Sequence, residues 1–229
     1  MNKAINILLF STLAIFCLMV LISVFDLSIS NLHLRGMPYK QQIFTSFALL
    51  VFLLGLLRIK RRWQGIRDMK NFTQFTASWT VSKSHLKHGM TITAIEVFFM
   101  MAALIFCLSV IPVEPMFVIP MLVVLVLLSL ESLYFIVILS KGGPAFRIGI
   151  NNQVVAVFDR EMHLYYYTGL EKVELHQSDM INFGYREDLN LPFETSVLDS
   201  KDKESFRQVL IDKLTENKVY VDSSLRNWK

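Results

Sequence analysis

Residues 116–150 read MFVIPMLVVLVLLSLESLYFIVILSKGGPAFRIGI, and this stretch decides the fold. Residues 116–140 carry a single charge, Glu131, and are long enough to cross a bilayer, because about 20 apolar residues span the hydrocarbon core. The Gly-Gly-Pro at 142–144 predicts the end of that helix. From Phe146 onward apolar residues alternate with others, which indicates strands. A membrane segment is therefore followed directly by a sheet-forming segment.

Three earlier stretches predict further membrane-spanning helices, at residues 4–25, 43–59 and 92–113. The stretch at 43–59 is the shortest, and the long side chains of Arg58 and Lys60 can extend it to the headgroups. A cleaved signal peptide is not expected at the N-terminus, because its apolar run is about twice the usual length and no small-residue cleavage pattern follows. We therefore predict a bundle of four transmembrane helices.

Charge divides the chain at the same place. Residues 1–140 hold 11 Lys/Arg and 5 Asp/Glu, whereas residues 141–229 hold 12 and 14, and together they give the net charge of +4. With 53% hydrophobic and only 18% charged residues, the chain is neither disordered nor a single soluble domain. Cys17 and Cys107 both lie in apolar stretches and are interpreted as packing residues, so no disulfide is expected. The predicted domains are 1–141 and 142–229.

Positive charge also predicts the orientation in the membrane. The segment from 58 to 87 has eight basic residues and one acid, whereas the loop between the first two spans has only Arg35 and Lys40. Basic loops stay in the cytoplasm, so the loop 59–90 and both termini are predicted there. We expect a multi-pass protein of a bacterial inner (plasma) membrane.

The basic loop 59–90 has two interpretations. Trp63, Ile66, Met69 and Phe72 recur every three residues between basic side chains, which suits a helix lying among lipid headgroups. Alternatively, the second span simply continues as a cytoplasmic helix with a solvated basic face. The candidate headgroup residues are Arg58, Lys60, Arg61, Arg62, Trp63, Arg67 and Lys70.

The C-terminal domain is predicted to be α+β. Its expected strands are 146–150, 154–158, 164–167, 170–175, 180–185 and 193–198, separated by turns at 159–161, 168–169, 177–178 and 190–192. A helix is expected after Asp199 or Ser200, which can cap it, and Asn217 fits its end. Its apolar positions are Phe206, Val209, Leu210 and Leu214. Residues 219–221 could add a short strand.

Strands followed by one amphipathic helix resemble the bacterial pleckstrin-homology-like (PH-like) domains that follow transmembrane helices. The resemblance covers about 75 of the 229 residues and rests on residues 143–148 (Gly-Pro-Ala-Phe-Arg-Ile) and on 172–175 with 179–183. It implies a small β-barrel capped by a helix that assembles with or binds protein. Some PH domains bind phosphoinositide through basic residues of the first hairpin, but here that turn, 151–153, is Asn-Asn-Gln. An α+β domain of another topology remains the alternative.

Glu96 and Glu131 are the candidate functional residues inside the membrane. A charge in hydrocarbon costs about 2.5 kcal/mol or more, so such acids are candidate functional residues by default. The two lie at similar depths and could face one another, or the basic end of the second span. They could form a proton relay. Alternatively, they could pair with Arg58, Lys60 or a hydroxyl such as that of Ser132, and so fix the helix register or hold a partner subunit.

Other chemistry is sparse. Phosphate-binding glycine loops and a Gly-x-Ser-x-Gly nucleophile elbow are absent from the sequence. His85 and His88 are weak candidates for a metal site, because zinc needs three or four ligands and no cysteine lies near. The aromatic run 165–167 has no basic stripe beside it, so nucleic acid is not expected as a partner. No cofactor and no catalytic residue are predicted.

Three classes of function remain. The first is a non-catalytic anchor or scaffold subunit of a homo- or hetero-oligomer, which recruits protein partners through its cytoplasmic domain. The second is a small oligomeric ion or proton channel, or a membrane-perturbing effector such as a defence effector, gated by that domain. The third is a lipid enzyme, for which His85, His88 and Glu96 are the only candidates. The first class accounts for most of the sequence.

Overall fold

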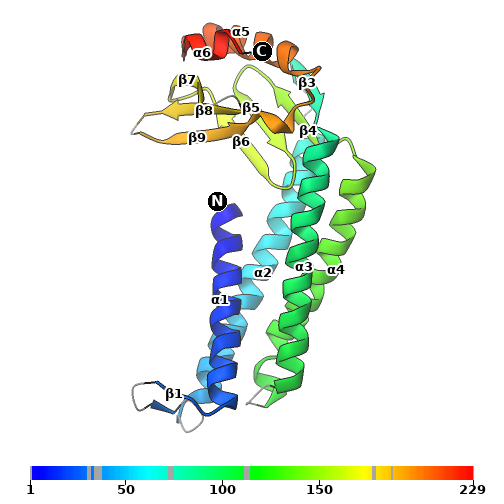
Figure 1. Ribbon diagram of the computed structural model, residues 1–229, viewed down its shortest axis with the longest axis vertical. Coiled ribbons are helices and arrows are strands. Elements are labelled where there is room, and N and C mark those ends of the chain that lie inside the picture. Colours follow the sequence, from blue (N-terminus) through cyan, green and yellow to red (C-terminus); the bar gives the residue numbers. More distant parts are fainter. Residues whose placement is uncertain are drawn as a thin grey trace. The chain divides into compact units, whose positions relative to one another are not determined.

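The computed structural model describes residues 2–29, 32–33, 38–71, 75–110, 114–176, 179–186 and 188–228. The chain, drawn in Figure 1, divides into two compact units. The first contains Met1–Trp63 and Thr91–Val137, and the second contains Gln64–Met90 and Ile138–Lys229. This division differs from a single boundary near residue 141, because residues 64–90 belong with the C-terminal part. Arg35, Phe72 and the turn expected at 177–178 lie outside the described residues.

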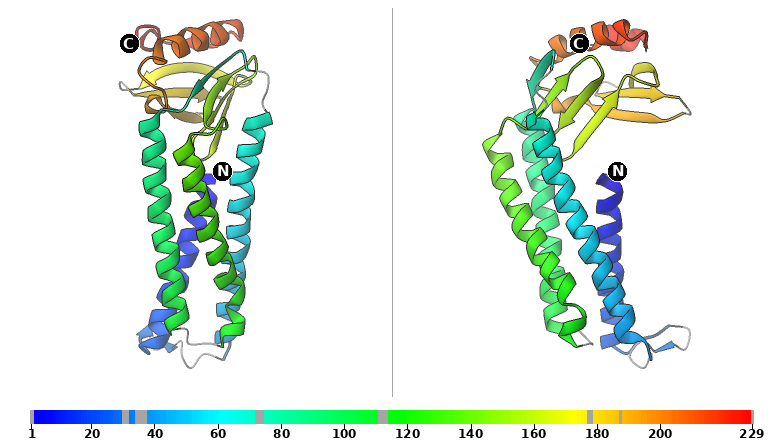
Figure 2. Two further views of the ribbon diagram at one scale, coloured as in Figure 1. Left: turned by 90° about the vertical axis from the view of Figure 1, so that its right-hand side faces the viewer. Right: turned by 180° about the vertical axis from the view of Figure 1, so that it is seen from behind.

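Four helices are long and apolar enough to cross a membrane, as the sequence predicts. They are α1 (Asn2–Val24), α2 (Lys40–Asn71), α3 (Lys83–Val110) and α4 (Ile119–Lys141). Within the first unit they run alongside one another (Figure 2). A hairpin of two short strands, β1 (Ser28–Ile29) and β2 (Leu32–His33), follows α1. A 3-10 turn, η2 (Pro115–Phe117), precedes α4. By the length and composition of these helices, the chain is a membrane protein.

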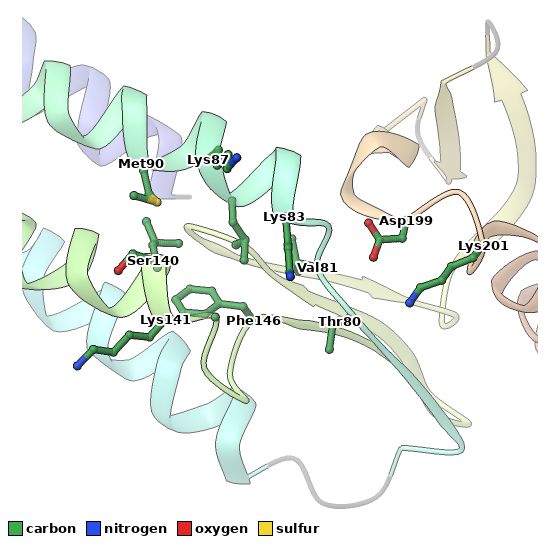
Figure 3. A pocket seen from close by; sticks show the side chains of 13 residues that line it. Thr80, Val81, Lys83, Lys87, Met90, Ser140, Lys141, Phe146, Asp199 and Lys201 are labelled. Carbon is green, nitrogen blue, oxygen red and sulfur yellow. The ribbon is translucent and has the colours of Figure 1, made fainter.

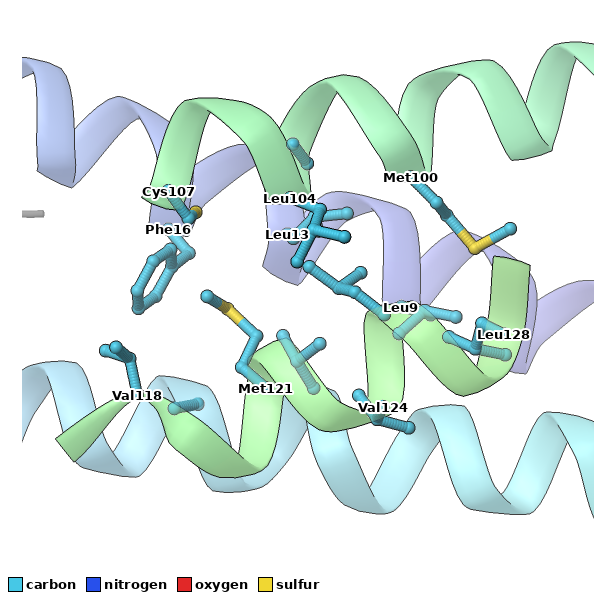
Figure 4. Close-up of a cluster of buried hydrophobic side chains, with 14 of the residues drawn as sticks. Leu9, Leu13, Phe16, Met100, Leu104, Cys107, Val118, Met121, Val124 and Leu128 are labelled. Atoms are coloured by element: carbon cyan, nitrogen blue, oxygen red, sulfur yellow. The ribbon is translucent and has the colours of Figure 1, made fainter. Parts of the chain in front are cut away.

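The interior of the first unit is a cluster of apolar side chains from all four helices (Figure 4). Phe16 of α1 meets Phe44 of α2 edge to face, with ring centroids 5.4 Å apart. Cys107 is fully buried in the cluster and Cys17 packs against it, both as free thiols. On the outside, Phe98 and Leu108 are 69% and 66% exposed, which suits side chains that face lipid.

The second unit contains two four-stranded sheets. In one, β3 (Ala77–Thr80), β4 (Arg147–Ile150), β5 (Val154–Phe158) and β6 (Met162–Tyr166) are consecutive antiparallel neighbours. The other has the order β10-β7-β8-β9. Its strands are β7 (Leu170–His176), β8 (Met180–Tyr185), β9 (Asn190–Glu194) and β10 (Tyr220–Val221), the last parallel to β7. Within the described residues no strand ladder joins the two sheets, so they do not close into a barrel.

Helix α5 (Lys203–Glu216) packs against both sheets and closes the core of the second unit. Its fully buried Phe206 stacks on Phe193 of β9, at 5.3 Å between ring centroids, and meets Trp79 of β3 edge to face. Tyr165 of β6 reaches the other sheet, where its ring lies 4.6 Å from that of Phe183. A short helix, α6 (Ser223–Arg226), follows β10.

Several local predictions for this unit are wrong. Residues 190–192 belong to β9 and not to a turn, and Thr195–Val197 form a 3-10 turn, η3, where a strand was expected. Helix α5 has Asp202 at its N-cap in place of Asp199 or Ser200, although Asn217 is its C-cap as expected. Strand β3 and helix α6 were not predicted at all.

The ends of the helices are part of the second unit. Gly65 of α2 lies so close to Phe158 that a Cβ atom there would be 2.8 Å from the ring. The guanidinium of Arg147 on β4 donates a 2.7 Å hydrogen bond to the backbone oxygen of Met69. Ile66 and Met69 are buried, at 6% and 0% exposure. This apolar face of α2 therefore packs on protein, which contradicts the first of the two interpretations, a helix lying among lipid headgroups. As in the second interpretation, α2 continues as a helix beyond the predicted span, to Asn71.

Candidate functional site: a buried arginine–glutamate cluster

Three helices of the first unit bring four charged side chains together. Arg58 and Arg62 are four residues apart on α2, so they lie on one face of that helix. Glu96 comes from α3 and Glu131 from α4. The four residues, called the charge cluster below, hold two positive and two negative charges and are neutral as a set.

The contacts within the charge cluster are direct. Arg58 donates a hydrogen bond to Oε2 of Glu96. Arg62 donates through Nη1 to Oε2 of Glu131 at 2.9 Å, and its Nη2 lies 3.9 Å from Oε2 of Glu96. Nη1 of Arg62 also lies 3.4 Å from the hydroxyl of Ser132. Arg62 therefore bridges both carboxylates and joins α2 to α3 and α4.

Aromatic rings cover the two guanidinium groups. The guanidinium of Arg62 lies over the ring of Phe135, 4.4 Å from its centroid, and that of Arg58 lies 5.5 Å from the centroid of Phe10 on α1. A cation over a ring face is attracted by the electron density of the ring. Phe135 is four residues after Glu131, so one face of α4 supplies both the anion and the ring. Through Phe10, α1 also contacts the cluster.

Burial makes the pairing necessary. The side chains of Arg58 and Arg62 are 4% and 7% exposed, and those of Glu131 and Glu96 are 8% and 14% exposed. A buried charge without a partner is strongly destabilising, whereas a hydrogen-bonded pair is tolerated. The arrangement therefore fixes the rotation and depth of α2, α3 and α4 within the first unit.

Some polar atoms of the cluster are not satisfied. Among the described residues, Oε1 of Glu131 and both Nε and Nη1 of Arg58 are buried without a hydrogen-bond partner. Such atoms are uncommon in folded proteins, and each calls for an explanation. This is the feature of the cluster that a purely structural role explains least well.

The lipid contact predicted for both arginines of the cluster is wrong. Arg58 and Arg62 are buried in ion pairs and do not face headgroups, because each guanidinium is taken up by an internal carboxylate. Trp63 stacks on Tyr134 of α4, with ring centroids 5.8 Å apart, and Arg61 is half-buried. Lys60, Arg67 and Lys70 are exposed, so headgroup contact remains a prediction for them.

The sequence indicated part of this site. From the sequence, Glu96 and Glu131 were predicted to lie near the basic end of the second span, with Arg58 and Ser132 among their possible partners. That prediction missed Arg62 as the residue that bridges both acids, and Phe135 as its aromatic cover. The signal available for both was the spacing of four residues, in Arg58 and Arg62 on one helix and in Glu131 and Phe135 on the other.

His85 forms a second ion-paired site, in the second unit. Its Nε2 lies 2.9 Å from Oδ2 of Asp159, which follows β5, and its Nδ1 lies 3.4 Å from the hydroxyl of Ser196. His88 is exposed and does not share this contact. Across the described residues no group of three or more His, Cys, Asp or Glu side chains could hold a metal ion. His85 is instead a link between the first turn of α3 and the sheet.

The pair shifts both pKa values in the direction that favours the charged form of each side chain. The hydrogen bond to Asp159 raises the pKa of His85, which precedes the predicted span, and outweighs the opposing effect of burial. Burial alone would raise the pKa of Asp159. The hydrogen bonds from His85 and from the backbone N–H groups of Arg160 and Glu161 outweigh it and hold the pKa at about 2.

The charge cluster predicts a large and non-additive effect of mutation. Arg62→Met leaves Glu131 without its buried partner and is expected to lower the free energy of unfolding by about 3 kcal/mol or more. Arg62→Met combined with Glu131→Met should be less destabilising than the sum of the two single changes. Equilibrium unfolding of the purified protein in mixed detergent micelles measures both. Lys60→Met, an exposed change on the same helix, is the control, and additive effects of the two cluster mutations would contradict the pairing.

The His85–Asp159 pair predicts a pH window. The contribution of His85 to stability is complete below its ordinary pKa of 6.5 and is lost as the pH rises through the higher folded value. The contribution of Asp159 is complete above its ordinary pKa of 3.8 and is lost as the pH falls through about 2. NMR titration of histidine-labelled protein should give a midpoint for His85 above 6.5, which Asp159→Asn lowers. A midpoint that Asp159→Asn leaves unchanged would contradict this assignment.

Comparisons with known proteins leave these residues as the basis for any functional conclusion. No family model, no curated protein and no solved structure matches the chain. The resemblance of the C-terminal part to PH-like domains therefore stays a prediction.

Proposed function

We propose that the chain is a non-catalytic subunit that anchors an assembly in the membrane and holds a protein partner through its C-terminal part. The observation that carries the proposal is the pairing of both membrane acids with arginines. Glu96 and Glu131 are bound by Arg58 and Arg62, so the charges that most suggest a reaction or a pore are used in holding helices together.

The surface of the second unit supports a partner-binding role. The described strands β6 and β10 lie at sheet edges, where their outer backbone groups have no neighbouring strand. On these edges Tyr166 is 50% exposed and Tyr220 is 64% exposed. Exposed tyrosines are enriched at protein interfaces, and a free edge accepts an added strand.

The order of elements also supports the proposed relation to PH-like domains. Strands β4 to β6 and strands β7 to β9 form two antiparallel meanders, and the amphipathic helix α5 follows them. A domain of that class implies a small scaffold that binds protein. The first turn, Asn151-Asn152-Gln153, has no basic residue, which speaks against the phosphoinositide site found in some of these domains.

Two measurements test the anchor function. Extracted in mild detergent, the protein is expected in a complex heavier than its own 26.5 kDa. A photo-crosslinking amino acid placed at Tyr166 or Tyr220 should give a discrete adduct, and the same group at Glu216, an exposed position on α5, should not. A monomer of 26.5 kDa with no adduct at either tyrosine would contradict the proposal.

A second function, an ion or proton path, is favoured by one observation. Oε1 of Glu131 is buried without a hydrogen-bond partner among the described residues and could accept a proton in transit. The pairing of the other Glu131 oxygen with Arg62 weighs against it, because the ion pair holds this carboxylate between α2 and α4.

Flux across vesicle membranes separates the two functions. With the anchor function, purified protein in liposomes loaded with a pH dye should conduct no more protons than empty liposomes. The double change Glu96→Gln with Glu131→Gln should make no difference. Flux in the unmodified protein that this double change abolishes would establish the path and contradict the anchor function as the whole account.

A further inference from the structure

The second unit has a cavity of about 610 Å³ that is unrelated to the charge cluster (Figure 3). Its walls are the end of β3, the first two turns of α3, the end of α4 and the segment just before α5. Its volume is within the range of about 300–1,000 Å³ that small-molecule sites occupy. The cavity is therefore large enough for a ligand of the size of a lipid headgroup.

Helix geometry explains why lysines line it. Lys83, Leu86, Lys87 and Met90 follow one another at spacings of three, one and three residues, so all four lie along one face of α3. That face borders the cavity. Lys141, the last residue of α4, also lines the cavity.

The remaining charges come from the segment before α5. Asp199 and Lys201 line the cavity, and in Figure 3 their side chains and that of Lys83 point toward one another. Among the described residues, the lining thus holds four lysines and one acid, a net charge of +3. Lys83 and Lys87 come from the segment 64–90, and the other three charges come from residues 141–229. Folding therefore gathers positive charge from two separate segments around one cavity.

Three of these lysines are available for a ligand. Within the described part of the chain, Lys83, Lys141 and Lys201 take part in no ion pair, and all three are exposed. Several ammonium groups around one cavity repel each other, and a bound anion relieves that repulsion. The cavity is therefore suited to an anion of more than one negative charge or with several acceptor oxygens.

The floor of the cavity is apolar. Val81, Leu86, Leu139 and Phe146 are buried there, at 4%, 8%, 1% and 2% exposure. Along the chain, Leu139 is at the end of the fourth predicted span and Met90 is just before the third. A lysine rim around an apolar floor, built from residues adjoining two spans, matches a molecule with an anionic head and an apolar body.

We propose that this cavity binds a phosphate-bearing anion and that the phosphate belongs to the headgroup of an anionic phospholipid. The lysines hold the phosphate oxygens, and the floor takes the glycerol and the start of the acyl chains. Free phosphate shares the anionic chemistry but would leave the apolar floor empty. The site is independent of the partner proposed above.

The test is a titration of the full chain in a neutral detergent, followed by native mass spectrometry. The probes are dioctanoyl phosphatidic acid, the zwitterionic dioctanoyl phosphatidylcholine and inorganic phosphate. Phosphatidic acid should saturate one site, and the other two should bind roughly tenfold or more weakly. Inorganic phosphate that binds as tightly as phosphatidic acid would overturn the lipid as the source, and equal binding of phosphatidylcholine would overturn the anion site.

Matched variants locate the binding. The double change Lys83→Gln with Lys201→Gln should weaken phosphatidic acid roughly tenfold or more, since each lysine near an anionic headgroup contributes about a factor of five or more. The control is Lys172→Gln with Lys218→Gln, which removes the same charge from exposed positions of the second unit outside the cavity and should change the affinity less than about twofold.

One further variant distinguishes a loss of the binding site from a general folding defect. Asp199→Asn removes the one acid among the described lining residues and should strengthen binding of phosphatidic acid, a gain that misfolding cannot produce. Equal losses in the two lysine double variants, or weaker binding by Asp199→Asn, would overturn the proposal.

Discussion

Two arginines inside an apolar helix constrain the rest of the first unit. A guanidinium stays charged at all physiological pH values and is costly to bury without an anion. Arg58 and Arg62 lie on one face of α2, so two carboxylates must be delivered to that face, and they come from α3 and α4. Apolar packing alone tolerates small rotations of a helix, whereas a buried ion pair does not. The charge cluster therefore selects one register among the many that four apolar helices could adopt.

Helix α2, which carries both arginines, also continues along the chain into the second unit. Beyond Arg62, α2 continues to Asn71, and its last turns pack on β5 and β6 through Gly65 and on β4 through the hydrogen bond from Arg147. The chain then enters β3, pairs with β4, and begins α3 at Lys83. The loop between two spans thus becomes an edge strand of a sheet, which explains why residues 64–90 fold with the C-terminal part.

What the sequence could predict depended on how local the determining interaction is. The four spans follow from long apolar runs that hold few charges. Strand β5 follows from a short apolar run between two turns, and β8 from buried Ile181 and Phe183 that alternate with less buried neighbours, so both strands have their predicted bounds. Strand β3 was not predicted because it is stabilised by pairing with the distant strand β4, with Ala77 opposite Ile150. The sequence around residues 77–80 does not indicate that pairing. Pro192 was interpreted as part of a turn, yet it lies in the edge strand β9, where a missing N–H costs little. The bridge between Arg62 and Glu131 joins residues 69 positions apart, and no local pattern indicates which acid a given arginine meets.

In the sequence, arginines and lysines contribute equally to the predicted orientation in the membrane. In the structure, the two residue types occupy different environments. Among the described residues, the two buried cations are arginines, whose planar, weakly hydrated groups can bind carboxylates and stack on phenylalanine rings at once. The cations around the cavity of the second unit are lysines, which are compact, strongly hydrated and exposed. A permanent internal pair favours the first type, because its geometry holds both partners. Binding of an exchangeable anion favours lysine, because an exposed ammonium group can replace a bound water molecule with a ligand at little cost in free energy. Arginine in the spans and lysine at the cavity thus separate the charges that hold this protein together from those that can bind something outside it.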